Sequence, residues 1–204
     1  MSDSDDLIPT LPLETRRKIL GYIIPLMNFP LMIWKIYQIT VGISTRGLKL
    51  TSLDTINDLI IISFSLILVL IVPNSSPIYA SSYWFTPKGL KIKRLLKGTT
   101  VLPYDSITRV DLYLRDEKKG EPNKEALDYA RDSMSELRRM GFKISDYTNS
   151  EKHIALVFSG NRIYMITPAY PKAFVQKLRK QTGRLNIKTI LLTPRGERIK
   201  PGLP

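Results

Sequence analysis

Two long apolar stretches dominate the first third of the chain. The first covers 19–41 and contains one charge, at Lys35. The second covers 57–79, and between 59 and 72 its polar residues are Ser63 and Ser65. A helix that crosses the hydrocarbon core of a bilayer needs about 20 residues. Both stretches reach that length, so we predict two transmembrane helices connected by a short loop.

The alternative is a pair of core helices in a soluble protein. The segment 59–72 is apolar around its whole circumference, and helices of small soluble proteins rarely lack a polar stripe. Pro25 and Pro30 predict a kink in the first helix, because each removes a backbone donor. Side chains with a polar end near the ends of these stretches are typical of anchors at a membrane interface. We predict these anchors to be Lys35, Tyr79, Tyr83 and Trp84.

Basic residues are distributed unevenly along the chain. It has 31 Lys and Arg against 18 Asp and Glu, a formal net charge of +13. Six basic and six acidic residues balance over 1–87, so the whole excess lies in 88–204. A basic cluster at 16–18 precedes the first helix, and basic residues flank membrane helices on the cytoplasmic side. We therefore predict a multi-pass protein of the cell membrane with both termini in the cytoplasm, including the flank 1–18.

From residue 81 the pattern changes to short segments of alternating polarity separated by turns, which is typical of β-strands. We expect strands at 83–86, 90–93, 99–103, 107–114, 153–158, 162–167 and 187–192. Within 107–114 the alternation places Ile107 and Arg109 on one face and Val110 on the other.

Two predicted helices interrupt this β pattern. Apolar residues spaced three and four apart indicate helices at 123–140 and 171–181. The first lies within 116–150, which separates two predicted strands and is therefore an insertion. The last segment, 184–204, has one short strand followed by Pro, Gly and basic residues, and we predict a basic, mobile tail.

Four segments allow a comparison with a known family. Residues 83–92 read Tyr-Trp-Phe-Thr-Pro-Lys-Gly-Leu-Lys-Ile, and 102–110 read Leu-Pro-Tyr-Asp-Ser-Ile-Thr-Arg-Val. Later, 160–168 contain the end of a predicted hairpin turn and the strand that follows it, and 171–178 begin a helix. In this order they resemble the prokaryotic pleckstrin-homology-like (PH-like) domains, in which a final hairpin runs into a C-terminal helix. The resemblance covers 79–183.

The resemblance and the apolar pattern together imply an α+β membrane protein. A transmembrane hairpin of two helices over 19–80 precedes a cytosolic PH-like β-sandwich or barrel over 81–183. A C-terminal helix caps that domain, which departs from the family pattern at the helical insertion 116–150 and is followed by the tail 184–204.

A dense group of positive charges follows the second helix. It consists of Lys88, Lys91, Lys93, Arg94 and Lys97. Near an anionic leaflet each basic residue adds about 1 kcal/mol of attraction. We predict that this basic hairpin binds anionic lipid headgroups or a protein partner. The alternative is a solvated basic face that only satisfies the charge asymmetry of membrane proteins.

Composition excludes several classes of site. The chain has no cysteine and one histidine, His153, so disulfides, thiolate metal sites and His-rich metal centres are excluded. No nucleotide-binding, nucleophile-elbow or zinc-protease motif is present. We therefore predict no enzyme activity, no cofactor and no metal.

The function predicted from these features is a membrane-embedded adaptor or assembly module. Its expected partners are membrane lipids and a protein, and further copies of the chain in a homo-oligomer are an additional expectation. One rival is an accessory subunit of a membrane enzyme or transporter, in which Lys35, Pro25 and Pro30 act within the helices. Another rival is a ribosome or nucleic-acid contact through the basic half, and we consider nucleic acid the weaker expectation.

Overall fold

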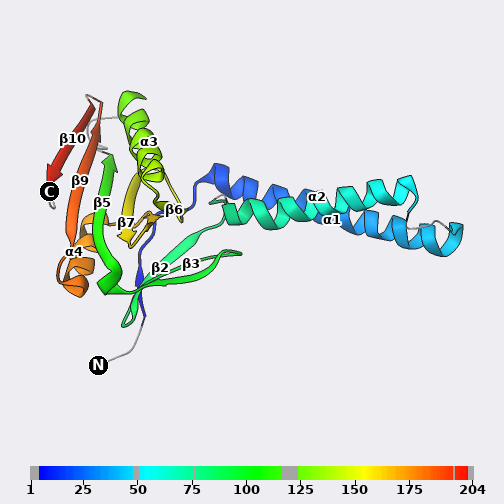
Figure 1. Cartoon of the computed structure of the whole chain (residues 1–204), viewed down its shortest axis with the longest axis horizontal. Coiled ribbons are helices and arrows are strands. Elements are labelled where there is room, and N and C mark those ends of the chain that lie inside the picture. The colour runs from blue at the N-terminus through cyan, green and yellow to red at the C-terminus, as the bar shows by residue number, and fades with distance from the viewer. Residues whose placement is uncertain (1–4, 48–50, 76, 116–123, 195, 202–204) are drawn as a thin grey trace. The chain divides into compact units, whose positions relative to one another are not determined.

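The computed structural model describes residues 5–47, 51–75, 77–115, 124–194 and 196–201. The chain divides into two compact units (Figure 1). Glu14–Tyr79 form one, which we call the helical unit. Met1–Leu13 and Ala80–Pro204 together form the other, the β-domain.

Two α-helices make up most of the described part of the helical unit, α1 (Thr15–Arg46) and α2 (Leu53–Ser75). Both are long and apolar enough to cross a membrane, over Thr15–Thr45 and Leu53–Val72. Their most apolar windows are only 6% and 17% buried in the structure, whereas a core helix of a soluble protein is mostly buried. Apolar side chains therefore cover most of the outer surface of this helix pair.

The first sheet of the β-domain has the order β1-β2-β3-β4 and is antiparallel throughout. Its strands are β1 (Asp6–Ile8), β2 (Ser81–Thr86), β3 (Gly89–Arg94) and β4 (Gly98–Leu102). In the chain β1 precedes the helical unit and β2 follows it. A single sheet thus contains both flanks of the helical unit.

The second sheet has the order β10-β9-β5-β7-β8-β6, and the short 3-10 helix η1 (Tyr104–Ser106) leads into it from β4. Its strands are β5 (Ile107–Arg115), β6 (Lys143–Asp146), β7 (His153–Ser159), β8 (Arg162–Ile166), β9 (Asn186–Thr193) and β10 (Gly196–Pro201). β9 runs parallel to β5, and β6 runs parallel to β8. The other neighbours are antiparallel.

The central strands of the second sheet, β5, β7 and β8, are buried on both faces. One face shares a core with the first sheet and with α4 (Pro171–Thr182), whose Phe174, Val175 and Leu178 are buried there. Against the other face lies α3 (Lys124–Arg139), through Met134 and Leu137. Alternate residues of β5 therefore enter different cores, as the polarity of this strand requires.

Most elements predicted from the sequence are confirmed, with boundaries shifted by a few residues. The placement of Ile107 is wrong: it lies in the same core as Val110, because a shift in register between Ile107 and Arg109 moves it to that face. The segment after 183 is not a separate tail, since β9 lies inside the second sheet and β10 pairs with it. Part of 116–150 lies outside the described residues, and the remainder contributes α3 and β6.

Candidate functional site

One buried amide joins the chain that leads into α1 to the chain that follows α2. Asn149 Oδ1 accepts a hydrogen bond from Ser81 N at 2.7 Å, and its Nδ2 donates to Ser81 O at 2.9 Å and to Leu11 O at 3.1 Å. The Asn149 backbone N–H donates to Thr167 Oγ1 at 2.9 Å. Asn149 therefore joins both flanks of the helical unit to the body of the β-domain.

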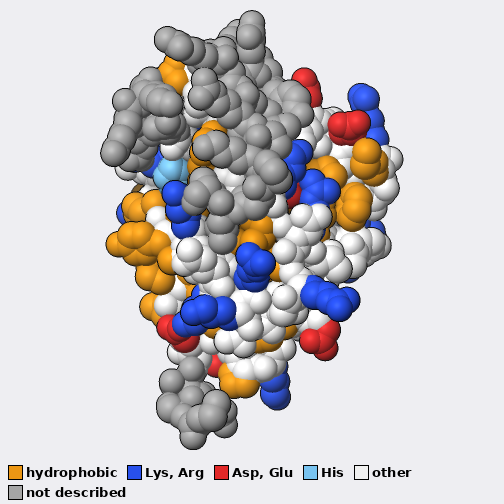
Figure 2. Space-filling model, turned by 90° about the vertical axis from the view of Figure 1, so that its left-hand side faces the viewer, with side chains coloured by type: hydrophobic (Ala, Val, Ile, Leu, Met, Phe, Trp, Pro, Cys, Tyr) orange, Lys and Arg blue, Asp and Glu red, His pale blue; other side chains and the backbone are white. Residues whose placement is uncertain are grey.

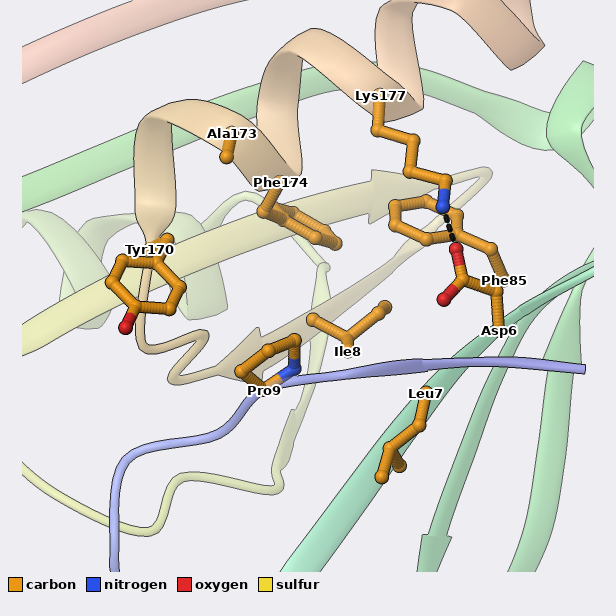
Figure 3. A pocket seen from close by; sticks show the side chains of 9 residues that line it. All are labelled: Asp6, Leu7, Ile8, Pro9, Phe85, Tyr170, Ala173, Phe174 and Lys177. Atoms are coloured by element: carbon orange, nitrogen blue, oxygen red, sulfur yellow. Dashed lines mark ion pairs between the residues drawn. The ribbon is translucent and has the colours of Figure 1, made fainter.

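Strand β1 packs between β2 and α4 (Figure 3). Ile8 is buried in the core with Phe85 and Phe174, whose ring centroids are 5.7 Å apart. Asp6 forms an ion pair with Lys177, whose Nζ lies 5.1 Å from the centroid of Phe85. Apolar burial and an ion pair thus make the N-terminal flank a structural part of the β-domain.

Further backbone contacts extend this attachment beyond β1. Leu11 N donates to Thr167 O at 3.1 Å, and Ala169 N donates to Pro9 O at 2.8 Å. Thr10 and Pro168 form an antiparallel bridge. The segment that leads into α1 is therefore paired until a few residues before the helix begins.

The cations of the predicted basic hairpin lie at three separate places in the first sheet. Lys88 is exposed in the turn between β2 and β3, and Lys91 and Lys93 lie on the outward face of β3. Arg94 is only 1% exposed, and Lys97 is half-buried after the turn that follows β3. These residues therefore do not present one continuous cluster of free charges. On the face shown in Figure 2, Lys and Arg side chains are likewise spread among polar and apolar groups.

Lys91 is already partnered within the β-domain. Its Nζ lies 2.7 Å from Asp5 Oδ2 and 5.4 Å from the centroid of the Trp84 ring. Both groups are partly exposed, so the ion pair contributes little stability. It does reduce the charge that Lys91 offers to a ligand.

Arg94 and Lys97 both contact the end of β6, which is distant in the sequence. Arg94 Nη1 donates to Asp146 O at 2.7 Å, and Lys97 Nζ donates to the same oxygen at 3.3 Å. The two cationic groups lie 5.2 and 4.4 Å from the centroid of the Tyr147 ring. Burial lowers the pKa of Lys97, and the charge of Arg94 lowers it further, while Asp146 opposes the shift. These contacts attach the base of the β3–β4 turn to the rest of the domain.

The tip of that turn is apolar and exposed. Leu95 and Leu96 are 61% and 52% exposed, and Lys97 N donates to Arg94 O at 3.2 Å across the turn. Leu96 has a φ of 63°, a left-handed conformation that is unfavourable for a leucine. This tip was not predicted from the sequence, although two adjacent leucines stand between Arg94 and Lys97 there.

Two of the predicted interface anchors belong to the β-domain. Tyr83 is 0% exposed, and its hydroxyl donates to Tyr147 O at 2.6 Å and accepts from Thr167 N at 3.2 Å. Burial raises its pKa to about 12. The prediction of Tyr83 as an interface anchor is therefore wrong, because its side chain fills the core. Trp84, the next residue, is half-buried on the outward face of the sheet.

The other two anchors lie in the helical unit. Tyr79 OH donates to Gly21 O at 3.2 Å, the carbonyl whose usual helical donor is missing because residue 25 is a proline. Lys35 Nζ lies 2.7 Å from Asp58 Oδ1 of α2. Instead of only extending toward a headgroup, Lys35 thus forms an ion pair between the two helices.

A cleft of about 590 Å³ surrounds this ion pair in the helical unit. Its lining is Trp34, Lys35, Tyr37, Gln38, Val41, Gly42, Asp54, Asn57, Asp58 and Ile61. Lys35 Nζ also donates to Gln38 Oε1 at 3.0 Å. Ionisable groups within membrane segments usually mark a functional path or a pairing between helices.

His153 lies at the start of β7, where its Nδ1 accepts a hydrogen bond from Arg115 N at 3.4 Å. Within the described residues, no group of three or more His, Asp or Glu side chains could hold a metal ion. Two regions contain predicted functional residues together with polar or apolar groups that could form a site: the β3–β4 turn, with Lys93 and Lys97, and the polar cleft of the helix pair, with Lys35.

Comparison with family models, with curated proteins and with solved structures gave no match for this chain.

Proposed function

We propose that the chain is a non-enzymatic integral membrane protein that presents its β-domain at the cytoplasmic face as an adaptor for a protein partner or for anionic lipid. The pairing of β1 with β2 is the observation that carries this proposal. The strand before the two apolar helices and the strand after them are hydrogen-bonded neighbours in one sheet. The two flanks therefore lie on the same side of any membrane that the helices cross. That requires an even number of crossings, which α1 and α2 supply.

The charge distribution supports the cytoplasmic side for the β-domain. The basic cluster 16–18 precedes the apolar part of α1, and the excess of positive charge lies after residue 87. Both regions lie on the side that would retain Lys and Arg during insertion. The residues between the helices then face the exterior.

We also propose a PH-like architecture for the β-domain. Support comes from its two packed sheets and from α4, whose apolar face is buried in the core between them. The parallel pairings of β9 with β5 and of β6 with β8 are additions to that plan. An experimental structure with a different strand connectivity would overturn this assignment and leave the membrane topology unaffected.

The topology is tested with single-cysteine variants, because the natural chain has no cysteine. Thr51 and Lys180 are both exposed, one between the helices and one on α4. A membrane-impermeant maleimide should label Thr51→Cys in intact cells and Lys180→Cys only after permeabilisation. Labelling of Lys180→Cys in intact cells would overturn the cytoplasmic placement.

The adaptor role is tested by proximity crosslinking of the intact protein in its native membrane. Reproducible recovery of one protein complex would support a protein adaptor, and its capture should survive moderate salt. Recovery of only lipid and further copies of the chain would support lipid binding and would contradict an adaptor role for a different protein. Capture of nucleic acid with a steep salt dependence would favour the ribosome or nucleic-acid alternative.

The polar cleft around Lys35 and Asp58 favours a second candidate function, an accessory subunit of a membrane enzyme or transporter. In that case the helices contribute residues to the path of the substrate, and the β-domain has a structural role. A Lys35→Leu variant that inserts normally would then abolish the transport phenotype, whereas an adaptor would retain its partner.

A further inference from the structure

We propose that the β3–β4 turn is a lipid-docking element, in which Leu95 and Leu96 enter the interface of an anionic leaflet while Lys93 and Lys97 lie at its headgroups. This inference rests on the proposed membrane location and narrows the ligand of the basic hairpin to an anionic lipid surface. Four observations support it.

The first observation is the chemistry of the tip. Leu95 and Leu96 are both more than half exposed, an uncommon position for two adjacent leucines in a tight turn. Lys93, two residues before the tip, is exposed, and Lys97 is half-buried directly after it. Apolar side chains flanked by cations match an anionic leaflet, which offers hydrocarbon beneath a layer of negative charge.

The second observation is strain. Leu96 adopts a φ of 63°, where glycine or asparagine would be favoured over leucine. Unfavourable backbone geometry is often retained where the residue has a function. Here it holds an apolar side chain at the tip that glycine would not provide.

The third observation is the rigid base of the turn. Arg94 and Lys97 share Asp146 O as an acceptor and lie near the ring of Tyr147. The Asp146 carboxylate accepts hydrogen bonds from Thr148 N and Thr148 Oγ1, at 2.8 and 2.7 Å. The turn is therefore organised before it meets a membrane, which reduces the entropy lost on docking.

The fourth observation is the connection to the helical unit. The apolar part of α2 ends at Val72, and Ser81, nine residues later, pairs with Arg94, the residue before the tip. The β3–β4 turn is thus at the end of the hairpin where the chain enters from α2. If α2 crosses the membrane, this connection of nine residues, roughly 30 Å at full extension, limits the distance between the turn and the bilayer. The β2–β3 turn, which contains Lys88, lies at the opposite end of the same hairpin.

The test uses the full chain in vesicles of phosphatidylcholine and phosphatidylglycerol, with an environment-sensitive fluorophore on a single cysteine. Leu95→Cys reports on the tip, and Lys88→Cys is the matched control at the other end of the hairpin. Spin-labelled lipids should quench the fluorophore at 95 and shield it from aqueous iodide, while the fluorophore at 88 remains open to iodide. Replacing Lys93 with Gln should weaken docking roughly fivefold in anionic vesicles, the ratio that corresponds to about 1 kcal/mol per charge, and should have little effect in neutral ones.

The alternative outcomes separate the docking proposal from the proposed function. Protease protection of the residues between the helices in the same vesicles reports whether the chain has inserted. Normal insertion with position 95 as open to iodide as position 88 would overturn lipid docking alone. Shielding at 95 without quenching by spin-labelled lipid would show a contact between protein copies and would also overturn it. Failure of the helices to insert would overturn both proposals.

Discussion

Tyr83 shows how one buried side chain makes the β-domain sensitive to alkaline pH. Its pKa is about 12 in the folded protein against 10.0 for an unperturbed tyrosine, so the folded state disfavours the phenolate. The resulting stabilisation is complete below pH 10 and is lost as pH rises through 12. We expect the free energy of unfolding to fall by about 2–3 kcal/mol over this interval.

A Tyr83→Phe variant checks this assignment. Because it lacks the ionisable group, its free energy of unfolding should fall less between pH 8 and pH 11.5 than that of the natural chain. At pH 8 the variant should be less stable than the natural chain, because Tyr147 O and Thr167 N lose their partner. Denaturant unfolding of the full chain in detergent at pH 8, 10 and 11.5 measures both effects. Tyr170→Phe, at an exposed tyrosine, is the matched control. Parallel pH profiles for the natural chain and Tyr83→Phe would contradict the prediction.

Leu96 leads to a prediction of opposite effects on stability and docking. Glycine tolerates a φ of 63° without the steric cost that leucine incurs, which is about 1–2 kcal/mol, but it loses more entropy on folding. We therefore expect Leu96→Gly to stabilise the β-domain by about 0.5–1 kcal/mol. The same variant should dock less well on anionic vesicles. Thermal unfolding and lipid quenching of the same sample measure the two effects. A variant less stable than the natural chain would contradict the claim that Leu96 strains the backbone.

At the residue scale the sequence predicted the charge and polarity of a segment better than it predicted where each side chain lies in the fold. Positive charge after the second helix is visible in composition, and Lys88 and Lys93 are exposed as expected. Arg94 is buried because Asp146 and Tyr147, about fifty positions later, supply an acceptor and an aromatic face. No pattern local to the hairpin reveals that partner.

At the scale of elements, polarity patterns identified most strands and the four longer helices within the described residues. The missing strands are those whose formation depends on distant partners. β1 has three residues, one of them Asp6, and it is stabilised by pairing with β2 and by packing against α4. β9 was predicted as a strand but placed in a tail, because parallel pairing with β5 leaves no mark in the local sequence.

The ion pair between α1 and α2 allows a prediction about the helix pair. Lys35 and Asp58 are both about one-fifth exposed without any lipid around them. Replacing either one by leucine leaves the other charge without its partner, and an unpaired charge in a membrane helix costs about 2.5–3.5 kcal/mol at the bilayer centre and less nearer the interface. We expect each single variant to destabilise the helix pair by about 2 kcal/mol.

The double variant Lys35→Leu/Asp58→Leu should recover most of that loss, because both charges are removed together. Unfolding of the helix pair by sodium dodecyl sulfate in mixed micelles, followed by far-ultraviolet circular dichroism, measures each variant. Thr40→Leu, at an exposed position of α1 that bonds within its own helix, is the control. Additive losses in the double variant would show that the two charges do not interact.

For the whole molecule, Asn149 joins the two segments of the β-domain that flank the helical unit in the chain. Its side chain donates to Leu11 O before α1 and bonds both backbone groups of Ser81 after α2. Removing it leaves these buried groups unsatisfied, at a cost of about 1–3 kcal/mol for each group that finds no water. We therefore expect Asn149→Ala to loosen the two flanks together, by about 3 kcal/mol of local stability.

Hydrogen–deuterium exchange of the full chain in nanodiscs measures this coupling. In Asn149→Ala, peptides covering 5–13 and 80–86 should exchange faster to a similar extent, while those from β7 and β8 change little. Asn149→Asp keeps an acceptor for Ser81 N, but its second carboxylate oxygen would face the carbonyl oxygens of Leu11 and Ser81 in a buried site, so both flanks should exchange at least as fast as in Asn149→Ala. Asn161→Ala, the same substitution in the exposed β7–β8 turn, should leave both flanks protected. Faster exchange confined to 5–13 would show that β1 opens independently, and the two flanks would then not be linked through this amide.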